Sequence, residues 1–213
     1  RLAQAAGCDA AGIDVGEFQV KKAAETGALA LLEAGVDTTE AVLDWSRGRG
    51  ADAVLLMASS SSSAIVRRAP ALCRDRANVV VVGDVGLNLD RRAFYERELN
   101  LRFARSYGPG RYERSYENWG VDYPPGLVRW SEGRNFEAVL DLLAAGQLAV
   151  ADLITHRFTI PDAARAYGLV DDASQPSLGI VFDYPEAPQP DTPIVLRPAR
   201  GGRRGIGLIG AGA

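Results

Sequence analysis

Residues 9 to 17 read DAAGIDVGE, a short apolar run that ends in Asp14 and is followed directly by a polar helix start. In a doubly wound nucleotide-binding sheet, an acid at the end of the second strand accepts hydrogen bonds from both hydroxyls of an adenosine ribose. A carboxylate at this place also repels a 2'-phosphate, so Asp14 favours NAD over NADP. The alternative is that Asp14 caps the helix that begins near Glu17.

The sequence on both sides of this stretch alternates between strand and helix signals. Strands are expected at 10–14, 28–32, 53–57 and 78–82, and helices at 17–26, 37–47 and 64–76. The valine run in 78–82 is typical of a strand that is buried on both faces. This alternation predicts an α/β fold with a doubly wound, Rossmann-like parallel sheet. Periodicity alone does not choose among the dehydrogenases, methyltransferases and other proteins that use such a sheet.

Composition excludes several classes of protein. The 213 residues carry a formal net charge of -3, which gives no electrostatic footprint for nucleic acid. No apolar run approaches the roughly 20 residues of a membrane span, and the first residues lack the apolar core of a secretory signal. Cys8 and Cys73 are expected to be small buried hydrophobes of a reducing compartment, which predicts a cytoplasmic protein.

Two short turns are candidates for binding the cofactor, because ligands of open parallel sheets bind at the carboxyl ends of the strands. Ala58 and Ser59 follow the third predicted strand. The second turn follows the valine strand and consists of Gly83, Asp84, Val85 and Gly86. The serine run 59–63 either faces a ligand with its hydroxyls and amides or forms a solvated helix cap. Both interpretations stay open.

The segment 106–126 is unusually rich in tyrosine, arginine, glycine and proline for a loop. Loops of this length are usually functional or disordered. Tyr107, Arg111 and Tyr112 are candidates for binding a sugar or an anionic substrate, through stacking and bidentate hydrogen bonds. Alternatively, the segment packs on a catalytic domain or on a partner subunit.

His156 is the only histidine, and the alternation of its predicted strand favours a structural, hydrogen-bonded role. One histidine and two distant cysteines cannot assemble a catalytic zinc site. We therefore expect no metal site in this chain, and no residue is assigned a catalytic role.

Three motifs carry a resemblance to a known family: FYERELNLR (94–102), SYGPGRY (106–112) and LITHRF (153–158). With their surroundings they resemble the medium-chain dehydrogenase/reductase family, near the threonine and sorbitol dehydrogenases. The chain is most similar to bi-domain oxidoreductases whose second half is of the Gfo/Idh/MocA kind. The motifs FYERELNLR and LITHRF speak against one alternative, a domain like the S-adenosylmethionine-dependent methyltransferases. A second alternative, a non-catalytic scaffold that recruits a partner through the aromatic loop and the sheet edge, stays open.

The resemblance implies a cofactor-binding portion of an NAD-dependent oxidoreductase, with hydride transfer to or from an alcohol, polyol or sugar. In the family, the backbone at Gly83 to Gly86 holds the nicotinamide carboxamide, and Ala58 and Ser59 lie on the adenosine side. A homo-oligomer, most simply a dimer, is expected. Zinc would be present only if an absent catalytic domain supplied it. As given, the chain is expected to lack catalysis.

The resemblance also implies how the chain divides. Residues 1–183 form the NAD-binding domain with part of the C-terminal segment of the catalytic domain, and 184–204 form a proline-rich linker. Residues 205–213, GIGLIGAGA, resemble the opening strand and glycine turn of a second dinucleotide-binding domain, with Gly210 and Gly212 in the fingerprint.

The expected Rossmann-like sheet lacks its own first strand and glycine turn, since only thirteen residues precede Asp14. That strand is central in the order 3-2-1-4-5-6, so its neighbours would expose unpaired backbone groups and an apolar slot. Two explanations are open. Either the segment 205–210 occupies the slot, from the same or a neighbouring molecule, or the sequence omits parts of the real polypeptide.

Overall fold

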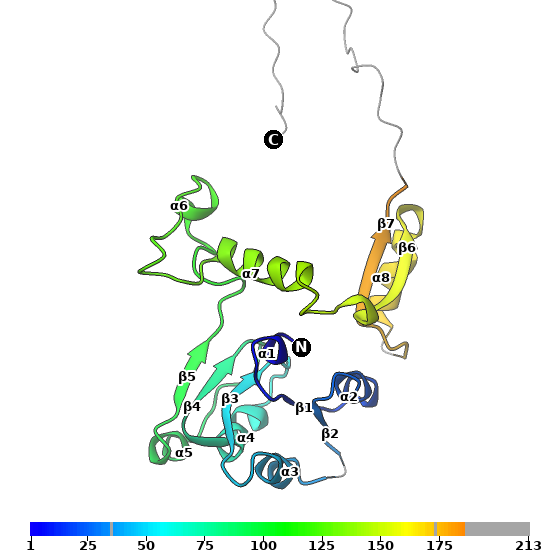
Figure 1. The fold of residues 1–213 in the computed structure, drawn as a ribbon. Coiled ribbons are helices and arrows are strands. Elements are labelled where there is room, and N and C mark those ends of the chain that lie inside the picture. The colour runs from blue at the N-terminus through cyan, green and yellow to red at the C-terminus, as the bar shows by residue number, and fades with distance from the viewer. Residues whose placement is uncertain (35, 173, 186–213) are drawn as a thin grey trace, which may run out of the picture. The chain divides into compact units, whose positions relative to one another are not determined.

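A computed structural model of the chain describes residues 1–34, 36–172 and 174–185 (Figure 1). The chain divides into two compact units, Arg1–Asp152 and Leu153–Ala213. The predicted linker 184–204 lies almost wholly outside the described residues, and the segment 205–213 lies outside them entirely. No helix in the described ranges is both long and apolar enough to cross a membrane.

The first unit alternates helices with parallel strands, as the sequence predicts. Its elements are α1 (Leu2–Ala5), β1 (Ala11–Asp14), α2 (Glu17–Ala24), β2 (Leu29–Leu32), α3 (Thr38–Trp45), β3 (Ala51–Leu56), α4 (Ala64–Leu72), β4 (Cys73–Val81), α5 (Arg91–Glu96), β5 (Asn100–Phe103), α6 (Arg114–Glu117) and α7 (Glu132–Ala144). Strand β1 pairs with β2, and the order of the second sheet is β3-β4-β5, with every pairing parallel. The prediction of a Rossmann-like α/β fold is confirmed.

The junction between α4 and β4 differs from the prediction. The helix expected to run to residue 76 ends at Leu72, and β4 already begins at Cys73. Pro70 in the last turn of α4 lacks the N–H that would continue the helical ladder. Cys73 is buried and pairs with Ala51 of β3, so packing and strand pairing override the helical pattern. Arg76, with φ 59°, then carries the chain through an irregular register.

The core of the first unit lies between the β3-β4-β5 sheet and helices α4 and α5. It consists of Leu56, Val66, Ala69, Cys73, Ala77, Val79, Val81, Val85 and Phe94. Burial raises the pKa of the Cys73 thiol to about 11, so this cysteine stays neutral, as expected of a buried hydrophobe. The same expectation is wrong for Cys8, which is exposed because it follows the one-turn helix α1 rather than packing under it.

The two sheets of the first unit are not joined to each other by any strand of the described residues. Strand β3 therefore lies at the edge of its sheet. In the order 3-2-1-4-5-6 the corresponding strand lies inside the sheet. Leu55 of β3 is 48 % exposed, whereas Val79 in the middle strand β4 is fully buried. The unpaired side of β3 is thus present among the described strands, whereas an apolar slot beside it stays a prediction. The segment 205–210 lies outside the described residues, so its occupancy of the slot stays a prediction.

An ion pair links the two sheets. Glu33 follows β2 directly, and Arg68 of α4 donates a hydrogen bond to its carboxylate, with Nη2 2.8 Å from Oε2. This hydrogen bond lowers the pKa of Glu33 below its ordinary value, although desolvation acts in the opposite direction. The Glu33 side chain is 39 % exposed, so solvent screens the pair.

The pair predicts a pH dependence of stability. Because the folded-state pKa of Glu33 is depressed, its stabilising contribution is present above the unfolded-state pKa and is lost as pH falls through the folded-state value. Glu33→Gln should lower the free energy of unfolding by at most about 1 kcal/mol at pH 7 and by less at pH 3. Urea unfolding at both pH values measures this. Asp44→Asn is the control, since Asp44 forms no ion pair among the described residues, and it should give the same free energy of unfolding as the wild type at each pH. A loss for Glu33→Gln that is equal at pH 3 and pH 7 would contradict the assignment.

The second unit is small. It contains β6 (Ile154–Thr159), α8 (Ala163–Asp171) and β7 (Gly179–Asp183), with one-turn 3-10 helices at Ala151–Leu153, where the unit begins, and at Ile160–Asp162. Strand β6 pairs with β7 in parallel. The motif LITHRF that carried the family resemblance therefore forms the first strand of this unit.

Candidate cofactor-binding site

Asp14 is the last residue of β1, and its side chain is exposed. The N–H of Gly16 donates to its Oδ1 at 2.8 Å, while Oδ2 accepts no hydrogen bond from the described residues. Gly16, and not Asp14, is the N-cap of α2, and no side chain caps this helix. The carboxylate is therefore held at the end of the strand with one oxygen open to solvent, which is the arrangement a ribose-binding acid requires.

The turns that follow β3 and β4 interlock. The N–H of Ser60 donates to the carbonyl of Asp84 at 2.8 Å, and the N–H of Gly86 donates to the carbonyl of Ser60 at 3.1 Å. These bonds form an isolated parallel bridge between Ser60 and Val85. The structure thus brings together the two turns that the sequence singled out separately.

Both glycines of the second turn are required by close approach of backbone. A Cβ on Gly83 would lie 2.1 Å from the carbonyl oxygen of Ala58, and one on Gly86 would lie 2.6 Å from that of Ser61. Neither distance is compatible with a side chain unless the backbone moves. The Val85 side chain is buried in the core, so Val85 offers a ligand its backbone only.

The serine run is used partly for local structure. Ser60 Oγ accepts from the N–H of Ser62, Ser62 Oγ accepts from Ala64, and Ser63 Oγ accepts from the N–H of Asn88 in the neighbouring turn. Ser59 is exposed, and its hydroxyl makes no hydrogen bond among the described residues. Three hydroxyls therefore support the turn and the start of α4, and the exposed hydroxyls of Ser59 and Ser61 are the two without a hydrogen bond among the described residues.

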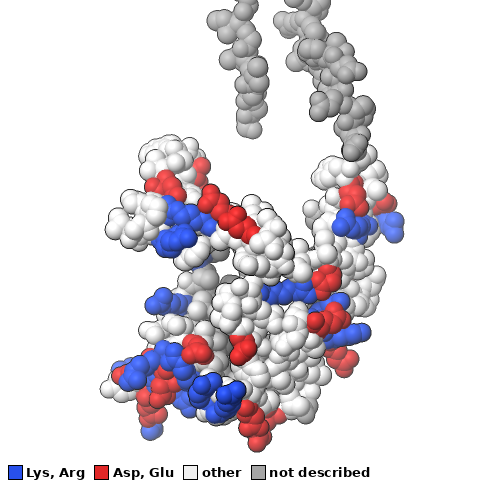
Figure 2. Space-filling view, viewed as in Figure 1, with Lys and Arg blue, Asp and Glu red and all other residues white. Residues whose placement is uncertain are grey.

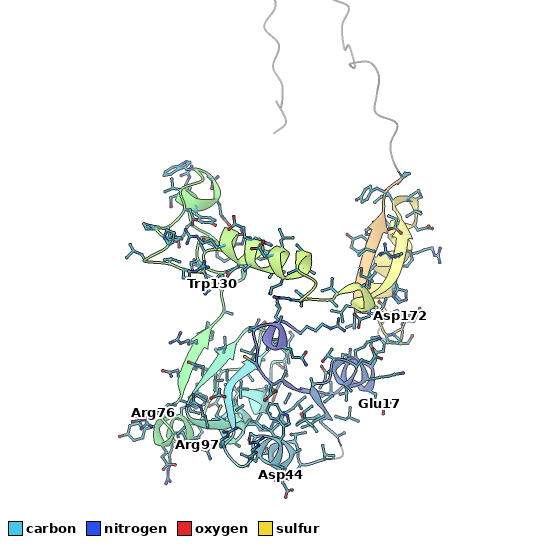
Figure 3. All side chains as sticks on the ribbon, in the orientation of Figure 1. Glu17, Asp44, Arg76, Arg97, Trp130 and Asp172 are labelled. Carbon is cyan, nitrogen blue, oxygen red and sulfur yellow. The ribbon has the colours of Figure 1, made fainter. Side chains whose placement is uncertain are left out.

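A groove of about 770 Å³ lies at the opposite, amino-terminal side of β4 and β5. Figure 3 labels Arg76 and Arg97, which belong to its lining. Arg76 is ion-paired with Glu98 at 2.5 Å, and Arg97 donates to the carbonyl of Cys73 at 2.8 Å. Because ligands of parallel sheets bind at the carboxyl ends of the strands, the groove is not a candidate for the cofactor.

The segment that the sequence treats as a long loop is ordered by its own side chains. We refer to residues 104–131 as the aromatic segment; it contains the short helix α6. Arg111 is ion-paired with Glu117 and lies over the rings of Tyr107 and Tyr112, with guanidinium-to-centroid distances of 5.8 and 4.5 Å. The hydrogen bond from Arg111 lowers the pKa of Glu117. Arg111 thus has a structural use within the segment, and its role toward a substrate stays a prediction.

The aromatic segment ends at Ser131, which is fully buried. Ser131 is the N-cap of α7, yet its Oγ caps no backbone N–H and has no hydrogen-bond partner among the described residues. A buried hydroxyl without a partner costs about 1–3 kcal/mol of desolvation. Ser131 therefore does not provide the stabilisation usual for a serine at an N-cap.

Ser131→Ala should be neutral or stabilise the protein by up to about 1 kcal/mol, because it removes an unsatisfied buried hydroxyl. Asp37→Ala is the matched control, since Asp37 caps α3 by accepting from the N–H groups of Thr39 and Glu40. That control should lose about 1 kcal/mol. Urea unfolding followed by circular dichroism measures both. An equal loss in the two variants would show that Ser131 caps its helix in solution.

His156 lies in β6, where its Nδ1 is 2.9 Å from the hydroxyl of Thr155 and its ring stacks on Phe158. This geometry agrees with a structural role. No group of three or more His, Cys, Asp or Glu side chains in the described parts of the chain could hold a metal ion. Gly210 and Gly212 lie outside the described residues.

Charge on the surface is mixed. On the face shown in Figure 2, basic and acidic side chains lie next to one another rather than in separate fields. Ion pairs between neighbouring side chains of the described residues include Arg92 with Glu96 at 2.7 Å and Arg157 with Asp183 at 2.8 Å. The visible face thus has no extended basic stripe of the kind that binds nucleic acid.

Comparison with solved structures shows which fold this is. An alcohol dehydrogenase from Thermus sp. ATN1 has a TM-score of 0.64 at 19 % identity, covering 83 % of this chain and 44 % of its own. A protein of Escherichia coli CFT073 is described as a short chain alcohol dehydrogenase in complex with NADH. Its TM-score is 0.57 at 18 % identity, and the match covers 79 % of this chain and 42 % of that protein. A protein of Bacillus thuringiensis described as an NADPH:quinone reductase has a TM-score of 0.59 at 14 % identity. The match covers 84 % of this chain and 50 % of that protein. The chain thus spans half or less of the length of each of these proteins.

A search of curated proteins finds no match. The model of a family described as zinc-binding dehydrogenase matches residues 1–119, more than half of the 213 residues. These residues include β1 to β5 and the two interlocked turns. Since family and fold agree, this chain belongs to the zinc-binding dehydrogenases and represents the cofactor-binding part of a medium-chain dehydrogenase/reductase.

Proposed function

We propose that the chain binds NAD as the cofactor-binding portion of an oxidoreductase that transfers hydride to or from a small alcohol or its carbonyl. The observation that carries the proposal is the carboxyl edge of the parallel strands. There, β1 ends in the open carboxylate of Asp14, and β3 and β4 end in two turns joined backbone to backbone. Crevices beyond the carboxyl ends of such strands are where nucleotides bind.

The residues at this edge fit a nicotinamide dinucleotide. Asp14 would accept from the ribose hydroxyls through its open oxygen, and the exposed Ser59 would lie on the adenosine side. The N–H groups of Asp84 and Val85 have no acceptor among the described residues, so this turn can donate to a carboxamide oxygen. When bound, the nicotinamide supplies the hydride acceptor and donor, and the protein supplies orientation and hydrogen bonds.

NAD is proposed over NADP because of the charge on Asp14. A 2'-phosphate carries about -1.5 to -2 charges near neutral pH. No Arg or Lys donates a hydrogen bond to Asp14 within the described ranges, so the carboxylate would meet that phosphate without compensation. The repulsion is greatest where water is displaced from between the two groups.

The substrate proposed is a small molecule with a secondary alcohol or the corresponding carbonyl, such as a polyol or a sugar. The family resemblance supports this class, and Tyr107, Arg111 and Tyr112 remain candidates for contacting it. Strand β5 pairs with no strand on its outer side within the described part of the chain, which supports a homo-oligomer formed through sheet edges. Two unpaired cysteines fit the reducing environment of the cytoplasm.

Isothermal titration of the 213-residue chain with NAD, NADP and S-adenosylmethionine tests the proposal. We expect heat of binding with NAD, at least about tenfold weaker binding of NADP, and no binding of S-adenosylmethionine. Equal affinities for NAD and NADP would contradict the assignment of Asp14. Binding of S-adenosylmethionine alone would contradict the proposal as a whole. Sedimentation velocity on the same sample measures the oligomeric state.

A further inference from the structure

The turn that follows β2 is bonded to the end of β1. Asp14 and Leu32 are partners in the register of the two parallel strands, and the N–H of Glu33 donates to the carbonyl of Asp14 at 2.8 Å. Glu33 is therefore the residue of the neighbouring strand end whose backbone lies directly beside the acid proposed to bind the ribose. Both acids lie at the carboxyl edge, where ligands of parallel sheets bind.

Glu33 holds an arginine that comes from the helix on the other sheet. Arg68 of α4 donates two hydrogen bonds to the Glu33 carboxylate, one from Nη2 to Oε2 at 2.8 Å and one from Nη1 to Oε1. This is the bidentate geometry in which a planar guanidinium fits a carboxylate. The side chains of Arg68 and Glu33 are 29 % and 39 % exposed, so both charged groups remain accessible to a ligand.

Helix α4 begins at this same edge of the sheet, because it follows the turn after β3. Its N-cap Ser63 accepts from the N–H of Asn88, and Arg67 donates to the carbonyl of Asn88 at 2.7 Å. The guanidinium of Arg67 is thus used to hold the neighbouring turn. Arg68, the next residue, has no ion-pair partner other than Glu33 among the described residues. A ligand can therefore recruit Arg68 by an exchange of this one partner.

The helix that follows Asp14 supplies no cation at its start. The charged residue in the first turn of α2 is Glu17, and its two lysines lie in the last turn. A 2'-phosphate on a ribose bound at Asp14 would therefore meet acids from both flanking segments. Within the described ranges, Arg68 is the cation that hydrogen bonds connect to this corner of the sheet, through Glu33.

A 2'-phosphate and the Glu33 carboxylate would compete for the same guanidinium, since both accept bidentate bonds from arginine. If Arg68 turned to the phosphate, it would leave Glu33 as an uncompensated negative charge. That charge would stand near a group that itself carries about -1.5 to -2 charges. As long as Glu33 is ionised, this repulsion offsets the gain from the new pair. Without the carboxylate, nothing opposes the pair of Arg68 with the phosphate.

From these contacts we infer that Glu33 is a specificity-determining residue for the dinucleotide, because it holds Arg68 away from the 2'-phosphate of NADP. Asp14 repels that phosphate directly, and Glu33 withholds the arginine that would compensate for the repulsion. In Rossmann-like sheets a nearby arginine is what accommodates a 2'-phosphate. Glu33 acts through Arg68 and is thus a positioning residue. The inference rests on the proposed function, since it concerns which dinucleotide binds at the same edge.

Isothermal titration of the 213-residue chain with NAD and NADP tests the inference. Glu33→Gln should bind NADP about tenfold more tightly than the wild type, with an NAD affinity unchanged within about twofold. The double variant Glu33→Gln/Arg68→Gln should lose this gain and return to within about threefold of the wild type, because it has the same net charge as the intact ion pair. A merely structural role of the pair would instead change the affinities for both dinucleotides together.

Glu96→Gln is the matched control, since it also releases an arginine from an ion pair, Arg92 within α5. It should bind both dinucleotides as the wild type does. Glu33→Ala replaces Glu33→Gln if circular dichroism shows that the latter is unfolded. An unchanged NADP affinity in the folded Glu33 variant, or an equal gain in Glu96→Gln, overturns the inference. A gain that persists in the double variant also overturns it and shows that Glu33 repels the phosphate by itself.

The NAD affinity of the wild type separates this inference from the proposed function. If the wild type binds NAD and the Glu33 variant gains nothing toward NADP, the inference fails and the proposed function stands. If neither dinucleotide binds to the wild type or to any variant, the proposed function fails, and the inference fails with it.

Discussion

Asp14→Ala is expected to weaken NAD binding by about 10- to 100-fold, the loss usual when hydrogen bonds to a charged group are removed. The open Oδ2 of Asp14 is the only group at the end of β1 that we assign to the ribose. The variant should also narrow the preference for NAD over NADP, because the carboxylate that repels a 2'-phosphate is gone. Isothermal titration of both dinucleotides measures the two effects together.

Asp44→Ala is the control for the loss of one negative charge, because Asp44 lies near the end of α3 and makes no ion pair in the described part of the chain (Figure 3). It should bind NAD as the wild type does. Circular dichroism must show that Asp14→Ala is folded, since its Oδ1 also accepts from Gly16. An NAD affinity unchanged within twofold in folded Asp14→Ala would remove Asp14 from the cofactor site.

The largest effect on stability is expected for Gly83→Ala, at about 3 kcal/mol or more. A Cβ at this position would lie 2.1 Å from the carbonyl oxygen of Ala58 and 2.8 Å from the carbonyl carbon of Met57. Both atoms belong to backbone, so no side-chain rotation can relieve the clash, and the turn after β3 must move. Urea unfolding followed by circular dichroism measures the loss.

Gly126→Ala is the control, since nothing lies within 4 Å of a Cβ there. It should change the free energy of unfolding by less than about 0.5 kcal/mol. Gly83→Ala should in addition weaken NAD binding, because the interlocked turns would separate. If the two variants unfold at the same urea concentration, the close approach of the turns does not exist in solution.

Much of the fold could be predicted from local pattern. Strand β1 and helix α2 begin and end within two residues of the predicted positions, and Asp37 caps α3 as its spacing indicates. Such features depend on the nearest neighbours in the chain, so sequence carries them directly. The early end of α4 could be predicted only in part, because Pro70 is a local signal, whereas the pairing of Cys73 with the distant Ala51 is not.

The candidate site was predictable in part. The turns after β3 and β4 could each be located, since ligand sites in parallel sheets follow the strands. Their hydrogen bonding through Ser60, and the clash that makes Gly83 indispensable, required coordinates. The ion pair of Arg111 with Glu117 likewise depends on the turn that contains α6, and the sequence offered no signal for it.

By itself the sequence determined the order of strands and helices, the acid at the end of β1 and the family, because periodicity and short motifs are local properties of the chain. Only the tertiary structure decided which backbones touch and which arginines are neutralised. The physical reason is that these contacts join residues far apart in sequence. Their energies depend on distances of a few ångströms, which no local pattern encodes.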